Sequence, residues 1–336
     1  MIPDNINNMV DANFSVASLS YTNLAGTYHN TLLANGRTLT VTNIFTVGVV
    51  DTGSTTPSQT FVTISGANAT VNVTNPASNL QVWVGSPTFN STANQATLDL
   101  SALDNFNATV SRLTVGASAV NNAINRPSGV LYLARTNHIT AGFQTTTMHA
   151  GTTTGNAAID VADCNSNTGS ASSLWLGLDN TFNADTIGVG RQKTTGNIRF
   201  NTIYANIAPY PKLTLRGFSS SRVSDLSIGD GVGNTGGTGL NGNALLGGGI
   251  LDAQVDVINV GRASAGTTGA GTTVGTLEFD AGTINVNTLN VGIQPVNNTG
   301  KVGTGTVNVN TNATIGDKGH LIVNGNLSLG TNVNSA

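Results

Sequence analysis

Five pairs of aspartates lie close together in the sequence and are the residues best suited to acid–base chemistry. The pairs are Asp99 with Asp104, Asp160 with Asp163, Asp179 with Asp185, Asp225 with Asp230, and Asp252 with Asp256. Cleavage of a glycosidic bond needs two carboxyl groups that face one groove, about 5–9.5 Å apart. These aspartates stand among Gly, Asn and Thr, where Asp is an ordinary turn residue. We therefore expect corner residues and no enzyme, with a polysaccharide lyase or hydrolase as the third function considered.

Few residues in the sequence have the type and spacing needed to bind a metal or a cofactor. His138 and His149 share a segment, but no acidic residue lies between them, so they make a poor zinc pattern. Asp160, Asp163 and the stretch around Asp230 carry the oxygen ligands that Ca²⁺ prefers, although the Gly-Gly-x-Gly-x-Asp calcium repeat is absent. We expect no cofactor, and calcium is the alternative.

The composition excludes several classes of protein. Charged residues make up 9% of the 336 residues, far below the roughly 25% of ordinary globular proteins. There is no basic stripe to neutralise phosphates, and no apolar run is long enough to span a bilayer, so we expect neither a nucleic-acid partner nor a membrane span. Hydrophobic residues make up 38% of the chain and recur in alternating patterns, which predicts folding rather than disorder. The single cysteine, Cys164, is predicted to be a small buried hydrophobe.

One short phrase recurs along the chain: two apolar residues flank one position, and a glycine closes the phrase. The closing residues of its ten copies are Gly48, Gly85, Gly116, Gly177, Gly190, Gly229, Gly261, Gly292, Gly316 and Gly330. Several spacings are close to thirty residues, and alternating apolar residues such as those of 276–279 and 283–286 precede the phrase. Period-two alternation is typical of strands with one buried face, and glycine suits corners that need a positive φ.

The repeat predicts an all-β fold, a parallel β-helix or β-solenoid, in which short strands stack about 4.8 Å apart. Coils of about 20–30 residues would give about 11–16 coils. A β-sandwich is the alternative, because Asn35-Gly36, Asn241-Gly242 and Asn324-Gly325 are hairpin-type turns. We expect residues 1–80 to form an irregular cap or assembly segment, residues 81–336 to form the solenoid, and residues 229–249 to project as a loop.

Three segments carry a family resemblance: residues 275–292, residues 184–193 and the opening segment 11–21. They resemble the autotransporter-associated β-strand repeat proteins, which are bacterial surface β-solenoids. This resemblance implies an exported structural or adhesive protein. The start of the chain lacks the basic and apolar regions of a secretion signal. We therefore expect a secreted or cell-surface protein whose signal peptide is absent from this chain.

Two functions follow from these patterns. The first is a self-assembling subunit of a surface filament, because open solenoid ends expose unpaired strand edges and the C-terminal segment continues the repeat without a cap. Such a subunit would polymerise with its own copies through the solenoid ends or through addition of an N-terminal strand. The alternative is a carbohydrate-binding adhesin or autotransporter-type passenger that contacts surface glycans through Trp83, Trp175 or the segment around Asp230.

Overall fold

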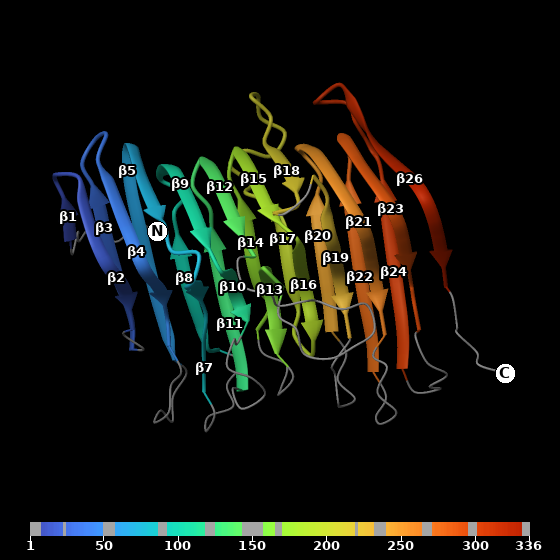
Figure 1. Ribbon diagram of the computed structural model, residues 1–336, viewed down its shortest axis with the longest axis horizontal. Helices are drawn as coiled ribbons and strands as arrows, with labels where there is room; N and C mark the ends of the chain where they lie inside the picture. The colour runs from blue at the N-terminus through green and yellow to red at the C-terminus, as the bar shows by residue number, and fades with distance from the viewer. Residues whose placement is uncertain are drawn as a thin grey trace.

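The computed structural model describes residues 8–22, 25–49, 58–86, 93–117, 125–142, 157–164, 170–218, 221–231, 240–263, 271–294 and 301–330. In this part of the chain every regular element is a β-strand, and the strands lie side by side from the N-terminal to the C-terminal end of one elongated body (Figure 1). Nearly all neighbouring strands pair in parallel. The chain is thus an all-β parallel solenoid, as the repeat predicted.

The solenoid has two long parallel sheets, and every coil contributes to both. Sheet A consists of β1 (Asn8–Val10), β3 (Ala25–Leu33), the first part of β5 (Gln59–Val73), β8 (Gln95–Asp99), β11 (Asn125–Tyr132), β14 (Ser172–Leu176), β17 (Gly196–Phe200), β20 (Leu240–Leu246), β22 (Gly271–Phe279) and β24 (Lys301–Val309).

Sheet B is wider, because each coil crosses it with one long strand or with two shorter ones. The long strands are β2 (Phe14–Tyr21), β4 (Thr38–Val47), β21 (Ile250–Arg262), β23 (Gly282–Val291) and β26 (Asp317–Leu329). In the middle coils the first half is β9 (Leu103–Val110), β12 (Thr136–Ala141), β15 (Asp179–Ala184) or β18 (Lys212–Arg216), and the end of β5 also belongs here. The second half is β6 (Asn79–Val82), β10 (Arg112–Ala117), β13 (Ile159–Cys164), β16 (Thr186–Gln192) or β19 (Val223–Asp230).

Two short strands stand apart from this parallel order. β7 (Val84–Ser86) pairs antiparallel with the start of β11, and β25 (Thr311–Asn312) pairs antiparallel with β26. Neither pairing contains an Asn-Gly turn: Asn35-Gly36 turns the chain from β3 into β4, and Asn241-Gly242 and Asn324-Gly325 lie inside β20 and β26. The hairpins that these pairs indicated are therefore not formed.

The described residues form ten coils, one for each strand of sheet A. This number is below the predicted eleven to sixteen. One reason is that residues 201–211, between β17 and β18, use residues without adding a coil.

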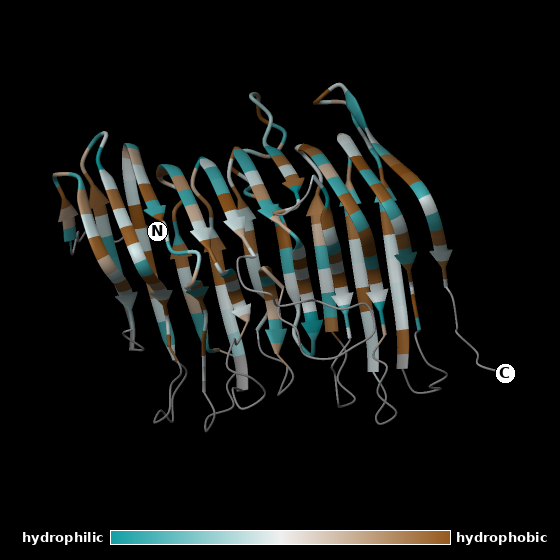
Figure 2. Cartoon of the chain, viewed as in Figure 1, coloured by the Kyte–Doolittle hydropathy of each residue, from teal (hydrophilic) through white to brown (hydrophobic). Residues whose placement is uncertain are grey.

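The hydrophobic core is a set of ladders that run along the solenoid between the two sheets. Apolar and polar residues alternate along most strands, and the apolar face of each sheet is buried (Figure 2). In β10, β13 and β16 the opposite face is buried as well. Four inward ladders of sheet B begin at Phe14, Val16, Leu19 and Tyr21, and each gains one residue per coil. The second of these ladders reads Val16, Val41, Val73, Ala108, Ile139, Phe182, Leu215, Ala253, Ile284 and Leu321.

A column of residues with positive φ lies near the end of sheet B, one position after the ladder that begins at Tyr21. Its members are Gly48, Gly116, Ala162, Gly190, Gly229, Gly261, Gly292 and Gly330. At Gly229 φ is +68°, and a Cβ atom would lie 2.2 Å from the carbonyl oxygen of Val274 in sheet A. Only glycine meets both demands, because the two sheets approach backbone to backbone at this edge. The prediction of glycine corners with positive φ is confirmed for this column.

Three closing glycines of the repeated phrase lie elsewhere. Trp83 takes the column position in the third coil, and Gly85 follows it in β7. Gly177 ends a strand of sheet A, and Gly316 lies in the turn between β25 and β26. The phrase therefore marks strand ends at more than one corner, because small residues are needed wherever the chain turns tightly.

The predicted subdivision of the chain differs from the structure at two places. Of residues 1–80, expected as an irregular cap, the described ones (8–22, 25–49 and 58–80) lie in the first coils of the same two sheets, in register with the rest. Of the expected loop 229–249, residues 229–230 belong to β19 and residues 240–246 to β20, while residues 232–239 lie outside the described residues. Scattered prolines and a glycine-rich run suggested irregularity, but the strands between them keep their alternation.

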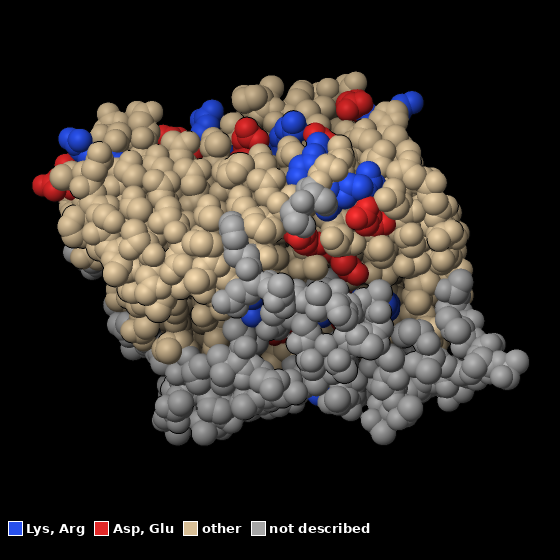
Figure 3. All heavy atoms as spheres, viewed as in Figure 1, with Lys and Arg blue, Asp and Glu red and all other residues tan. Residues whose placement is uncertain are grey.

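Charged side chains are gathered rather than spread. In the view of Figure 3 they lie mainly along one rim and in one cluster, and most of the remaining described surface on this face is uncharged. No helix among the described residues has the length and hydropathy needed to cross a membrane.

Candidate functional site

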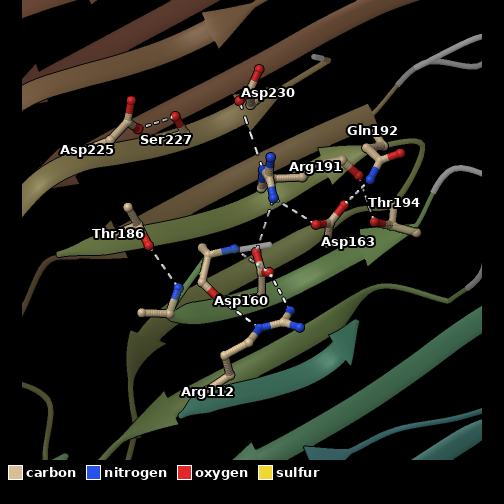
Figure 4. A network of polar contacts seen from close by, with 12 residues as sticks. Arg112, Asp160, Asp163, Thr186, Arg191, Gln192, Thr194, Asp225, Ser227 and Asp230 are labelled. Atoms are coloured by element: carbon tan, nitrogen blue, oxygen red, sulfur yellow. Dashed lines mark hydrogen bonds and ion pairs between the residues drawn. The ribbon is translucent and has the colours of Figure 1, made fainter. Parts of the chain in front are cut away.

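The described residues contain one dense group of ionisable side chains, which lies on the second half of sheet B. It comprises Arg112 in β10, Asp160 and Asp163 in β13, Arg191 in β16, and Asp225 and Asp230 in β19, all labelled in Figure 4, together with Arg262 in β21. We call this group the charge ladder. All seven side chains are buried, with relative exposures of 6% or less. The parallel pairing of β13, β16, β19 and β21 places Asp163, Arg191, Asp230 and Arg262 in one row with alternating charge.

Close ion pairs hold this row together. Arg191 Nη1 lies 2.7 Å from Asp163 Oδ2, and Gln192 Nε2 donates to the other oxygen of Asp163 at 2.6 Å. Arg262 donates twice to Asp230, from Nε at 3.0 Å and from Nη2 at 2.6 Å. This bidentate geometry gives the strongest hydrogen bonding between a guanidinium and a carboxylate. The row therefore ties four consecutive coils to one another.

Asp160 is fully buried and is the least well paired carboxylate of the ladder. Its Oδ2 accepts from Arg112 Nη2 at 3.3 Å and from the backbone N–H of Ala157 at 2.8 Å. Its Oδ1 lies 3.6 Å from Arg191 Nη1 and accepts no hydrogen bond from the described residues. Burial, and next the negative charge of Asp163, raise the pKa of Asp160 to about 7, although Arg191 and Arg112 act in the opposite direction.

Burial and neighbouring charges also shift the pKa values of Asp225, Arg112 and Arg191. Burial raises the pKa of Asp225 above its usual range, even though Arg262 lies near and Ser227 donates a hydrogen bond of 2.6 Å. Burial lowers the pKa of Arg112. For Arg191, burial also acts to lower the pKa, but the charges of Asp163, Asp160 and Asp230 outweigh it and raise the pKa overall.

Glycine makes room for the ladder. A Cβ atom at Gly188 would lie 2.5 Å from Arg191 Cδ and 2.8 Å from Asp160 Oδ1. Gly188 stands opposite Asp160 in the neighbouring coil. Because Gly188 has no side chain, the side chain of Arg191 has room to extend toward Asp160. The sequence held a signal for this arrangement, since Arg191, Asp230 and Arg262 each follow directly after a closing glycine and alternate in charge.

The ladder meets the needs of a structural ion-pair network more closely than those of a catalyst or a metal centre. The carboxylates of Asp160, Asp163 and Asp230, expected as oxygen ligands for calcium, are bonded to guanidinium groups, which supply the positive charge. Among the described residues, no three His, Cys, Asp or Glu side chains are grouped closely enough to hold a metal ion.

The remaining aspartates named from the sequence make separate local contacts. Asp252 pairs with Arg216 at 2.8 Å, and Asp256 pairs with Arg222 at 2.9 Å. The others bond to turns and to neighbouring coils: Asp99 Oδ1 accepts from the backbone and the hydroxyl of Ser101, Asp104 accepts from the backbone N–H of Asn68, and Asp185 accepts from the backbone N–H of Phe218. Among these aspartates only Asp185 lies between two strands, whereas Asp99, Asp104, Asp252 and Asp256 lie within β8, β9 and β21, and Asp179 begins β15. The expectation of corner residues is therefore wrong for most of them, as it is for the aspartates of the charge ladder.

The residues expected to contact glycans are placed differently from one another. Trp83 is buried, with 4% exposure, and its indole N–H donates to Gln81 at 3.1 Å. Asp230 is fully buried in the charge ladder. Trp175 lies half-buried on the outer side of sheet A, where the ring of Tyr132 stacks on it at 5.6 Å and the guanidinium of Arg199 lies 4.9 Å from its centroid.

The surroundings of Trp175 bear on how it could bind a sugar. Tyr132, Trp175 and Arg199 occupy the same row of three successive coils, so Tyr132 and Arg199 lie on opposite sides of the indole ring. A sugar ring packs against an open aromatic face, and both faces of this indole are occupied. This stack therefore resembles a ladder that stabilises neighbouring coils, and Trp175 offers mainly its edge to a ligand.

Cys164 and His138 both lie on sheet B. Cys164 is buried with 4% exposure in β13, as predicted. His138 is exposed on the outer side of sheet B and lies 3.4 Å from the amide nitrogen of Asn183, while His149 lies outside the described residues.

Comparison with known proteins adds no relative: no protein-family model, curated protein or solved structure matches the chain. The class is therefore defined by the fold alone, and the chain is a parallel β-solenoid protein.

Proposed function

We propose that this chain is a non-enzymatic structural protein of the bacterial cell surface whose copies stack end to end into a filament. The observation that carries this proposal is that the interior ladders reach both ends of the solenoid and remain uncovered there by described residues. The surface location comes from the resemblance to autotransporter-associated repeat proteins and belongs to the proposal.

At the N-terminal end, the first coil leaves apolar side chains and strand edges open. Among the described strands, β1 pairs only with β3 and β2 only with β4, so each has an outer edge without a partner there. Phe14 is 58% exposed although it begins an inward ladder, and Met9 is 62% exposed. A groove of about 410 Å³ lies between these strands, lined by Met9, Val10, Phe14, Val16, Leu19, Tyr21 and Leu39 among others.

The C-terminal end shows the corresponding features. Within the described part of the chain, β24 pairs only with β22, and β26 pairs with β23 and the short β25. Leu327 and Leu329 are the last members of two inward ladders and are 55% and 65% exposed. Earlier members of the same ladders, such as Leu113 and Val115, are fully buried. The exposure at this end thus arises because no described coil follows.

The two ends match in register when one copy stacks on the next. The four ladders that begin at Phe14, Val16, Leu19 and Tyr21 end at Gly319, Leu321, Leu327 and Leu329, respectively. In a head-to-tail stack, Phe14 of the next copy would follow Gly319, so a large side chain meets a residue that has none. All strands of both sheets would continue in parallel. Such a contact joins two different surfaces and does not close on itself, so it propagates into a fibre.

The experiment uses one variant for each end. We expect the wild-type chain to form filaments in negative-stain electron microscopy and large species in analytical ultracentrifugation. Phe14→Glu at one end and Leu329→Glu at the other should each abolish filaments, because a buried unpaired charge is costly. A mixture of the two variants should give a dimer and nothing longer, since one intact interface remains. His138→Glu changes an exposed residue on the outer side of β12, in a middle coil, and should assemble normally.

Two results would contradict the proposal. One is a wild-type protein that stays monomeric at high concentration. The other is filament formation that Phe14→Glu and Leu329→Glu leave unchanged, which would move the contact to another surface. Circular dichroism of each variant establishes that the coils themselves are intact.

A further inference from the structure

The charge ladder contains an unequal number of opposite charges in a buried place. Its carboxylates are Asp160, Asp163, Asp225 and Asp230, and its guanidinium groups are Arg112, Arg191 and Arg262. Four negative groups thus face three positive ones, all at relative exposures of 6% or less. An uncompensated charge in a buried site costs several kcal/mol, so such a cluster gains by taking up one proton.

The hydrogen bonds show which carboxylate takes up that proton. Asp163 accepts charged or amide donors on both oxygens, and Asp230 is bonded twice to Arg262. Asp225 accepts from Ser227 on one oxygen and from the amide of Asn259 on the other. Asp160 alone has an oxygen, Oδ1, that accepts no hydrogen bond from the described residues.

The described charged groups nearest Asp160 lie on the two strands that pair with β13 and on β13 itself. Arg112 faces it from β10 and Arg191 from β16, while Asp163 lies on β13 itself. Asp230 lies beyond Arg191, which it approaches at 4.0 Å, and Asp225 also acts on Arg191. Arg262 is engaged with Asp230. Arg191 is therefore shared among several carboxylates, so Asp160 receives only part of its charge.

We propose that the charge ladder is a proton-dependent lock between the middle coils: Asp160 holds a proton in acidic and neutral surroundings and loses it in alkaline ones. With the proton in place, the ladder is neutral and ties β10, β13, β16, β19 and β21 together. Without it, a buried negative charge remains, and these coils separate more easily. This lock does not depend on end-to-end stacking.

The test compares the wild type with Asp160→Asn, which imitates the protonated carboxyl in size and charge. We expect the urea midpoint of the wild type to be lower at about pH 8.5 than at about pH 5, and that of Asp160→Asn to be nearly the same at both. Asp252→Asn is the matched control, because Asp252 also pairs with an arginine but its side chain is 42% exposed. It should keep the pH dependence of the wild type.

A second measurement needs no variant. Infrared spectroscopy of the wild type near pH 6 should show the carbonyl stretch of a protonated, buried carboxyl group, and this band should vanish on titration to alkaline pH. Two results would overturn the inference: the absence of such a band, or an Asp160→Asn variant that folds and keeps the wild-type pH dependence.

Discussion

The column of positive-φ residues at the closing edge of sheet B makes a sharp prediction at Gly229. Changing Gly229 to alanine imposes two separate costs. A left-handed backbone costs a residue with a Cβ atom about 1–2 kcal/mol. The new Cβ would also lie 2.2 Å from the carbonyl oxygen of Val274, and crowding of this kind costs typically about 1–3 kcal/mol. We expect Gly229→Ala to lower the free energy of unfolding by about 2–5 kcal/mol in total.

Gly36 separates the two costs. Its φ is +71°, close to that of Gly229, but no heavy atom lies within 4 Å of the position of a Cβ atom. Gly36→Ala should therefore cost only the backbone part, about 1–2 kcal/mol. Ala162 offers the reverse change, since it already occupies the column at φ 66°, and Ala162→Gly should stay within about 1 kcal/mol of the wild type.

The assay is urea unfolding followed by far-ultraviolet circular dichroism, with thermal melting as a second measure. The quantity that decides is the difference between Gly229→Ala and Gly36→Ala, because slight departures from two-state unfolding in a repeat protein affect both variants alike. If the two variants lose the same stability, the close approach of the two sheets at this edge does not constrain the fold, and the reasoning fails.

Three further predictions follow from the core and the charge ladder. Arg262→Ala should lower the stability by about 3–5 kcal/mol in urea unfolding, because it leaves Asp230 buried without its two-pronged partner; a loss below about 1 kcal/mol would contradict this. Phe182→Ala, in a fully buried ladder, should cost about 3–5 kcal/mol, whereas Tyr28→Ala on the exposed side of sheet A should cost far less; equal costs would contradict the assignment of the two faces. The pKa of Asp160 is raised to about 7 in the folded protein, so between about pH 4 and pH 7 the folded protein keeps a proton that the unfolded chain has lost. The contribution of Asp160 to the free energy of unfolding should therefore fall by about 1.4 kcal/mol per pH unit in this range. Proton uptake measured on folding at pH 6 checks the sign, and proton release would contradict it.

The alternation of apolar residues and the glycine-closed phrase were enough to predict the parallel solenoid. Both are local properties, because the period of two is fixed by the strand backbone and a corner with positive φ selects glycine whatever lies around it. The buried state of Cys164 was also predictable from its residue type. The domain boundaries were harder to predict: residues 1–80 looked irregular in sequence, yet their described strands join the same sheets.

The candidate site was decided by tertiary structure, because its members come together only through the register between coils. Asp163, Arg191, Asp230 and Arg262 are up to about a hundred positions apart in the chain and become neighbours when four coils stack in register. The sequence shows Arg191, Asp230 and Arg262 at the same position after a closing glycine, but the register that places them against one another is set only when the coils stack. In the same way, the identity of Trp83 and Trp175 indicated aromatic contact, but only packing determined that one is buried and the other is covered on both faces by Tyr132 and Arg199.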